Sequence, residues 1–275
     1  MQRKLISTFI FLFMIGSAVS QTGGRVYFGW GYNRDWYSKS DIRLQNSNPQ
    51  LINGKYYTYD FTVYDAAAKD RPDFNQITDV VNITIPQFSF RIGYYLGNKK
   101  DFGIELNYDH AKYVVNDYQK VRVKGQISGD YFDKDTILDP KTFLHFEHTD
   151  GANFWMMNFV KRWKLVESKN QKNNIAFILK PGIGIVYPRT DVTIFGNRIN
   201  NEWKISGMIA GIELGLRAEF LKYGFIEFTG KGAYANYMNA IVQGKGYGKA
   251  SHKFWVGEAV LIVGYQLGIK NNKLK

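Results

Sequence analysis

The chain has 275 residues, a formal net charge of +12 and no cysteine. The lack of cysteine excludes disulfides, a lipid-modified cysteine anchor, a thiolate nucleophile and a cysteine-ligated metal centre. So basic a composition is typical of nucleic-acid-binding proteins, but the N-terminal segment predicts export. We therefore expect an anionic membrane surface as the partner and no nucleic acid.

The first twenty residues have the features of a secretory signal peptide. Arg3 and Lys4 precede a short apolar run over residues 5–19, and small residues stand before Gln21. We expect cleavage there, which divides the chain into a signal peptide, 1–20, and an exported part, 21–275. Beyond the signal, no apolar run reaches the length of about 18 residues that a transmembrane helix needs.

Apolar and polar residues alternate with a period of two along most of the exported part, which is the pattern of β-strands. In residues 205–220, for example, Ile212 and Leu214 fall on one face, while Glu213 and Arg217 fall on the other. The segments are longer than strands of globular proteins, which average about 5–6 residues. Eight strands are predicted, at about 25–37, 84–97, 102–115, 152–165, 174–187, 205–220, 224–238 and 253–268.

The connections between these segments alternate in length. Residues 97–101, 166–173 and 221–223 are short, and residues 38–83, 116–151, 188–204 and 239–252 are long. Short turns at one end and long loops at the other characterise outer-membrane barrels. The sequence predicts an all-β fold, an antiparallel eight-stranded transmembrane β-barrel with long extracellular loops, in the outer membrane of a Gram-negative cell. We expect a monomer, inserted by barrel assembly machinery.

The first long connection has a strand pattern of its own. Asp41–Leu44 and Tyr57–Val63 alternate and flank the turn-forming residues 46–50. This pattern predicts an extra hairpin within residues 38–83.

Charged residues recur on the face predicted to point inward. An eight-stranded barrel is narrow enough for side chains to fill its interior, and charges buried there must pair. We therefore expect a filled polar lumen rather than a solute pathway. The predicted lumen network consists of Arg91, Glu105, Asp109, Lys180, Glu213, Arg217, Glu219, Glu227, Lys231 and Glu258.

The histidines offer the strongest candidates for catalysis. Outer-membrane lipid A deacylases of the eight-stranded kind use a His-x-Ser-Asn motif, and the segment around His148 is similar to it at the histidine. Asp150 stands where the nucleophilic serine would be, which removes acyl-enzyme chemistry. His148, Asp150 and Glu147 are therefore kept as candidates, while the expectation is that the chain has no catalytic residues.

We expect these residues to lie at the outer rim instead. His148 lies just before the fourth predicted strand, His110 and Lys112 end the neighbouring third strand, and Arg34 lies near the top of the first. Exposed cationic groups at this height would bind the phosphates of lipopolysaccharide and other membrane lipids.

Neither a metal nor a cofactor is expected. Acidic residues are closely spaced in two of the long connections, but they lack the glycine turn of a calcium loop. They are Asp60, Asp65, Asp70 and Asp73 in one connection and Asp130, Asp133, Asp135 and Asp139 in the other.

The whole exported part resembles a family of small outer-membrane barrels that is common in Bacteroidetes and has no assigned activity. The residues that carry the resemblance are 36–42, 59–62, 70–72 and 146–151. The resemblance implies a fold and a location, not a reaction. The favoured function is a structural or surface-interaction role at the lipopolysaccharide layer. The alternatives are a lipid A-modifying hydrolase and a conduit for small or apolar molecules.

Overall fold

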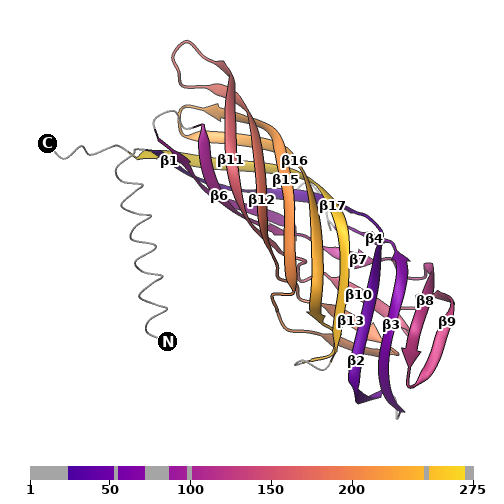
Figure 1. Ribbon diagram of the computed structural model, residues 1–275. Helices are drawn as coiled ribbons and strands as arrows, with labels where there is room; N and C mark the ends of the chain where they lie inside the picture. Colours follow the sequence, from indigo (N-terminus) through magenta and orange to yellow (C-terminus); the bar gives the residue numbers. More distant parts are fainter. Residues whose placement is uncertain (1–23, 53–54, 72–86, 98–100, 245–247, 270–275) are drawn as a thin grey trace, which may run out of the picture.

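The computed structural model describes residues 24–52, 55–71, 87–97, 101–244 and 248–269 (Figure 1). The expected signal peptide and Asp73 lie outside these residues. Eight long antiparallel strands pair in the order β1-β5-β6-β11-β12-β15-β16-β17, and β17 pairs with β1 to close the ring. These strands are β1 (Gly24–Tyr37), β5 (Phe88–Leu96), β6 (Phe102–His110), β11 (Phe154–Glu167), β12 (Asn174–Val186), β15 (Gly207–Phe220), β16 (Gly224–Ile241) and β17 (Lys249–Ile269).

The pairing register fixes the tilt of the strands. A line of paired residues that leaves β1 at Tyr37 returns to β1 at Tyr27, so one circuit shifts the register by about ten residues. In barrels such a stagger accompanies a strand tilt of roughly 35–45°. Between those two tyrosines the line passes through Val256, Ala233, Gly211, Gly182, Asn158, Glu105 and Gly93.

The outward face of the ring is apolar. Phe159 is 69% exposed, Ile183 64% and Phe228 62%, and no other part of the described chain covers them. Aromatic side chains cluster towards both ends of this surface, as at the two interfaces of a membrane barrel. At the end near the chain termini the pairs are Trp163–Phe177 and Tyr223–Tyr265, and at the other end they are Tyr108–Trp155, Tyr187–Trp203 and Tyr234–Trp255.

Among the described residues, no helix is both long enough and apolar enough to cross a membrane.

Beyond the end of the ring that is far from the termini, the chain forms a second body, which we call the distal sandwich (Figure 1). One of its sheets continues from β17 through β2, β3, β8 and β9, and the other has the order β14-β13-β10-β7-β4. Its strands are β2 (Ser40–Ile52), β3 (Lys55–Ala66), β4 (Ala68–Lys69), β7 (Tyr113–Val115), β8 (Lys120–Ile127), β9 (Asp130–Ile137), β10 (Leu144–His148), β13 (Asp191–Ile194) and β14 (Asn197–Asn200).

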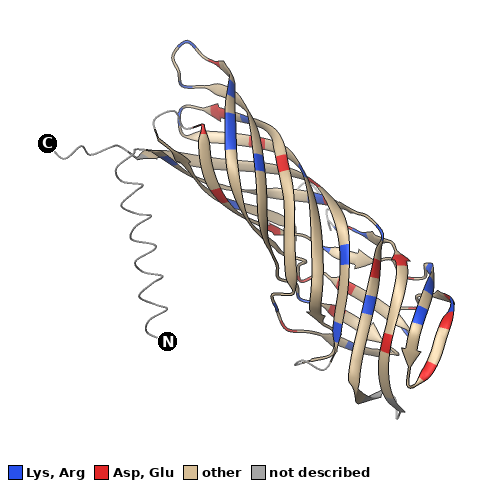
Figure 2. Cartoon of the chain, in the orientation of Figure 1, with Lys and Arg blue, Asp and Glu red and all other residues tan. Residues whose placement is uncertain are grey.

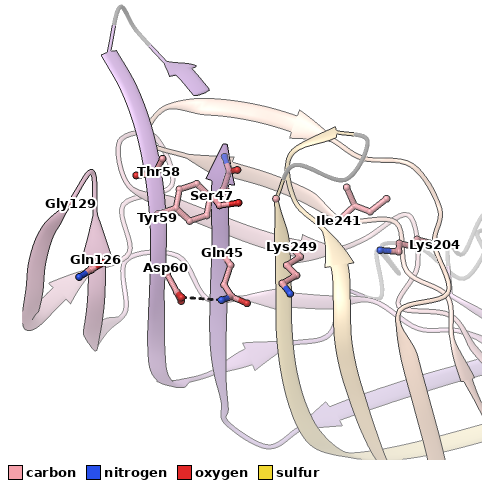
Figure 3. A pocket seen from close by; sticks show the side chains of 12 residues that line it. Gln45, Ser47, Thr58, Tyr59, Asp60, Gln126, Gly129, Lys204, Ile241 and Lys249 are labelled. Atoms are coloured by element: carbon pink, nitrogen blue, oxygen red, sulfur yellow. Dashed lines mark hydrogen bonds between the residues drawn. The ribbon is translucent and has the colours of Figure 1, made fainter. Parts of the chain in front are cut away.

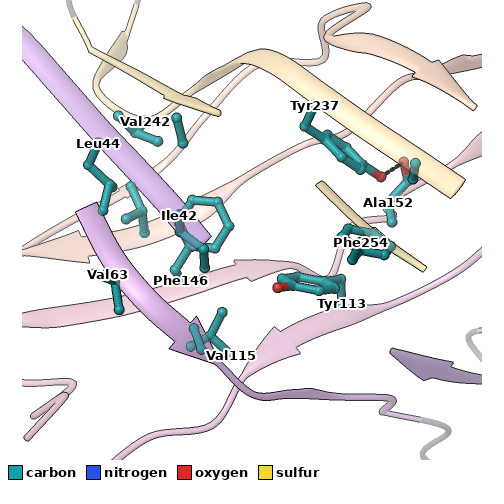
Figure 4. Close-up of a cluster of buried hydrophobic side chains, with 14 of the residues drawn as sticks. Ile42, Leu44, Val63, Tyr113, Val115, Phe146, Ala152, Tyr237, Val242 and Phe254 are labelled. Atoms are coloured by element: carbon teal, nitrogen blue, oxygen red, sulfur yellow. Dashed lines mark hydrogen bonds between the residues drawn. The ribbon is translucent and has the colours of Figure 1, made fainter. Parts of the chain in front are cut away.

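A hydrophobic core fills the distal sandwich (Figure 4). Ile42 and Leu44 of β2, Val63 of β3 and Phe146 of β10 are all fully buried. Burying a side chain of this size contributes about 1.5–3 kcal/mol. Tyr237, Phe254 and other residues from the far ends of β16, β17 and β11 complete the same core, so the sandwich and the ring are one packed unit.

The predicted fold class is confirmed, but the connections differ from the prediction. The hairpin expected within residues 38–83 is present as β2 and β3, whereas residues 116–151 and 188–204, expected to be loops, also contain strands. Alternating residues such as Val121 and Val123 of β8 reach the sandwich core. Residues 46–50, expected to form a turn, lie within β2, where the register shifts between Asn46 and Gln50. The third predicted strand, 102–115, divides into β6 and β7, which belong to different sheets.

Candidate functional site

The interior of the ring holds ion pairs that cross it from wall to wall. Arg91 on β5 donates to Glu213 on β15 over 3.3 Å, and Lys231 on β16 donates to Asp109 on β6 over 2.5 Å. Each of these pairs joins strands on opposite sides of the ring. Side chains that meet across the interior leave no wide channel at these levels.

The middle of the lumen is organised around Lys180. Its ammonium group donates to Glu105 at 3.0 Å, to Glu213 at 3.3 Å and to Glu227. Tyr27 adds a hydroxyl bond to Glu105. A buried ammonium has three donors, and here each of them has a carboxylate acceptor.

The part of the lumen nearest the termini is organised around Arg217 and Glu219. Arg217 bonds Glu227 at 3.3 Å and lies 3.5 Å from the centre of the Phe225 ring. Glu219 accepts from Arg162 at 2.5 Å and from Arg25 at 3.0 Å.

All the predicted lumen residues lie inside the ring and are buried, and they join in one network of ion pairs. Three further charged residues of the lumen, Arg25, Arg162 and Asp35, were not predicted from the sequence. The signal for Arg162 was present, because residues 154–163 alternate between outward positions, apolar except for Lys161, and inward ones, and Arg162 falls on an inward position. Figure 2 shows charges of both signs along the ring and the distal sandwich.

Above the ion pairs, where the ring meets the distal sandwich, two histidines are hydrogen-bonded to each other. Nε2 of His148 lies 3.1 Å from Nε2 of His252, and Nδ1 of His148 lies 3.1 Å from the Thr190 hydroxyl. Tyr237 stacks on both rings. Burial lowers the pKa of His148 far below its usual value and that of His252 to about 3, so both rings are neutral.

The partners of this pair indicate which nitrogens carry the protons. Nδ1 of His252 is buried without a hydrogen-bond partner, and a buried N–H without an acceptor is less favourable than a bare ring nitrogen. His252 therefore donates from Nε2 to His148, and His148 donates from Nδ1 to Thr190.

The expected position of His148 at an exposed rim is wrong. His148 is fully buried, because Tyr237, His252 and Tyr113 converge on it from distant parts of the sequence. Asp150 does not reach it, and forms an ion pair with Arg189 at 3.0 Å instead.

The third catalytic candidate, Glu147, belongs to a separate group. It accepts hydrogen bonds from Thr149 and Arg71 and lies 3.2 Å from Nε2 of His145. The hydrogen bonds of His145 to Glu147 and Asp117 raise the pKa of His145 to about 9. The structure thus does not bring the candidates together as a catalytic unit.

Only part of the predicted cationic rim is exposed. Lys112 is buried, and His110 bonds Asn153 at 2.8 Å. The side chain of Arg34 is 56% exposed and forms an ion pair with Asp70 at 3.1 Å.

The acidic residues of the long connections are mostly paired with cations. Asp60 accepts two bonds from Arg43, and Asp133 accepts from Arg122. Within the described ranges, no cluster of three or more histidine or acidic side chains is placed to hold a metal ion.

A polar pocket of about 660 Å³ opens at the far tip of the distal sandwich (Figure 3). Gln45 donates to Asp60 at 3.0 Å across its wall, and Lys249 and Lys204 line the opposite part. Beside it, the buried Gln243 accepts from Tyr59 at 2.7 Å. Amide, hydroxyl, carboxylate and ammonium groups gathered in this way suit a ligand rich in hydroxyl groups.

A closed ring with an apolar outer surface and an ion-paired interior defines an eight-stranded transmembrane β-barrel. No protein-family model matches the sequence, and no curated protein matches it. Among solved structures, the chain is similar to three small bacterial outer-membrane proteins or surface proteins at identities of 9–12%.

The first is Ail, the attachment invasion locus protein of Yersinia pestis, at 11% identity and a TM-score of 0.33, covering 89% of this chain and 99% of Ail. The second is OprG from Pseudomonas aeruginosa, at 12% identity and a TM-score of 0.37, covering 90% and 98%. The third is the Neisserial surface protein A, at 9% identity and a TM-score of 0.34, covering 88% and 96%. These similarities concern the fold alone.

Proposed function

We propose that the chain is an integral outer-membrane barrel whose filled lumen anchors the distal sandwich on the cell surface, where it interacts with the lipopolysaccharide layer. The chain would be exported by its signal peptide and inserted by barrel assembly machinery. The apolar outward face of the ring supports membrane insertion, and the ion pairs that cross the lumen argue against a role as a wide conduit.

The observation that carries the proposal is the distal sandwich itself. Loops that merely connect strands need no core, whereas here the segments beyond the ring bury Ile42, Phe61 and Phe146 completely. A folded distal sandwich on a ring with a filled lumen is suited to holding a binding surface outside the membrane. Its tip pocket, with Gln45, Asp60 and Lys249, has hydrogen-bonding groups that fit saccharide hydroxyls.

The first experiment tests orientation. Because the chain has no cysteine, single cysteines report cleanly on location. Lys134→Cys lies on the exposed β9 hairpin of the sandwich, and Lys169→Cys lies in the β11–β12 turn at the opposite end. A membrane-impermeant maleimide should label Lys134→Cys on intact cells and Lys169→Cys only after permeabilisation. The reverse pattern, or recovery of the protein in the soluble fraction, would refute the proposal.

The second experiment tests the interaction. The purified barrel in detergent should bind the core oligosaccharide of lipopolysaccharide, and replacing Gln126 and Lys249 in the pocket with alanine should weaken binding about tenfold. The matched control is Lys120→Ala and Lys134→Ala on the adjacent hairpin, which lies outside the pocket. Equal binding by both double variants would remove the pocket from the proposal.

A third experiment addresses the hydrolase alternative. The barrel is incubated with lipid A, and acyl release is followed by mass spectrometry with a His148→Ala control. We expect no release, because His148 is enclosed in the core and Asp150 is paired elsewhere. Release that depends on His148 would favour hydrolysis and overturn the non-enzymatic role.

A further inference from the structure

A hollow interrupts the apolar outer surface of the ring. Outward positions on three adjacent strands carry very small residues, and they are neighbours in the register: Gly232 pairs with Gly257, and Gly230 pairs with Ala259. A Cβ atom added at Gly230, Gly232 or Gly257 would meet nothing within 4 Å. Gly230 and Gly232 floor a groove of about 790 Å³ that reaches across β15 and β12 to β11, and Gly257 and Ala259 of β17 pair with them along one edge of it.

The walls of the hollow are apolar and aromatic. Tyr234 and Trp255, with ring centres 5.1 Å apart, close its end towards the distal sandwich. Ile212 and Leu214 of β15 and Met157 of β11 line it further along. A second groove of about 570 Å³ shares Met157 and continues the same surface. From β11 to β17 the hollow spans about 19 Å at the usual spacing of strands.

The aromatic end of the hollow marks its depth. Trp255 and Tyr234 belong to the aromatic cluster at the sandwich end of the ring, and such clusters lie at the membrane interface. The hollow therefore lies within the half of the bilayer that adjoins the distal sandwich.

Two cations stand at the border of the hollow. Arg34 of β1 is the paired neighbour of Ala259, which itself pairs with Gly230, so its outward side chain adjoins the floor. It is 56% exposed, and the ion pair of its Nε with Asp70 restricts its position. Lys253 is exposed two residues beyond Trp255 on the same face of β17. Cations at the level of lipid headgroups attract phosphate groups.

We propose that this hollow binds one phosphorylated glycolipid of the lipid A class, with acyl chains on the glycine floor and phosphate against Arg34 and Lys253. The apolar floor and the bordering cations match the two ends of an anionic lipid. The breadth of five adjacent strands suits several acyl chains side by side better than a single chain. The inference rests on the proposed outer-membrane function and names the lipid that the barrel wall would hold.

The test fills the hollow without disturbing the fold. Ala210→Leu and Gly232→Leu place bulk in the hollow, and Ala218→Leu is the matched control, because Ala218 is exposed on the same face of β15 near the opposite end. Arg34→Gln together with Lys253→Gln removes the cations, and Lys161→Gln, on the outward face near the termini, is the charge control. Native mass spectrometry of detergent-solubilised barrels measures the bound fraction with added lipid A or phosphatidylglycerol.

We expect lipid A to bind the unaltered barrel and to bind at least tenfold more weakly when the hollow is filled or the two cations are removed. Both controls should bind as the unaltered protein does. Equal binding by the filled variants and the Ala218→Leu control would overturn the inference, and so would phosphatidylglycerol binding as tight as that of lipid A. A shift of electrophoretic mobility on heating shows that each variant is folded. Failure here with correct cysteine labelling would remove the lipid site alone, whereas wrong labelling would remove the proposed function.

Discussion

Replacing Lys231 with methionine should destabilise the barrel more than most single changes in the lumen. Its ammonium group is buried, 2.5 Å from Asp109 and 2.7 Å from Glu258. Asp109 retains its ion pair with Arg91 at 2.7 Å in the variant. Lys231 is the only cation within ion-pair distance of Glu258 among the described residues, so the variant leaves a buried carboxylate without a counter-charge. Removing one partner of a buried pair costs about 3–5 kcal/mol.

A second substitution separates the charge effect from simple loss of packing. In the double variant Lys231→Met, Glu258→Gln, the uncompensated charge is gone, and we expect it to regain about 2 kcal/mol or more relative to Lys231→Met alone. The assay is a urea titration of the barrel refolded into lipid vesicles, followed by the electrophoretic mobility of unheated samples. Lys161→Met, on the outward face, should change stability by less than about 1 kcal/mol. A Lys231→Met barrel as stable as the unaltered one, or no recovery in the double variant, would refute the reasoning.

Three further outcomes are expected. Arg217→Ala should lower stability by about 3 kcal/mol in the same titration, because it removes one partner of a buried ion pair. The loss stays at the lower end of the range because Glu227 and Glu219 each keep another cation; an unchanged midpoint would contradict burial of Arg217. Planar-bilayer recordings should show no stable wide conductance, and a steady large channel would contradict the crossing ion pairs. The distal sandwich should become more sensitive to protease as the pH falls from about 6.5 to about 3. The upper limit is the usual pKa of a histidine, which applies in the unfolded state, and the lower limit is the pKa of His252 in the folded state. Over this range the unfolded state binds more protons, so each buried histidine costs about 1.4 kcal/mol per pH unit. Replacing both His148 and His252 with phenylalanine should remove the dependence above about pH 4.5, below which carboxylates such as Glu147, with its lowered pKa, also contribute.

The ring could be predicted from the sequence because its strands carry a local signal. In residues 205–220 the side chains alternate between the inward and the outward face, so each position can be assigned from the residues two places away. Successive strands joined by short turns pair with each other, so their pairing can be predicted without knowing contacts between distant parts of the sequence. The inward charges followed from the same alternation, so the lumen network was foreseen apart from residues such as Arg162.

Apart from the hairpin of β2 and β3, the distal sandwich could not be predicted in the same way. Its strands are short or irregular, β7 having three residues and β4 two, and its core joins segments far apart in the sequence. His148 illustrates the difficulty. Its position before the fourth ring strand placed it near the barrel mouth, but its burial depends on Tyr237 and His252, about a hundred residues away. No local pattern contains that information.

The shared core of the ring and the distal sandwich constrains the order in which the protein can assemble. Tyr237 and Phe254, which lie in that core, belong to β16 and β17, and β17 also pairs with β2 of the sandwich. The sandwich therefore has no complete core until these ring strands are in place. In the orientation proposed above, its segments have to cross the membrane before that core can close, so the distal sandwich is the last part to form. Its folding then holds the finished barrel in one orientation, because withdrawal would require unfolding it again.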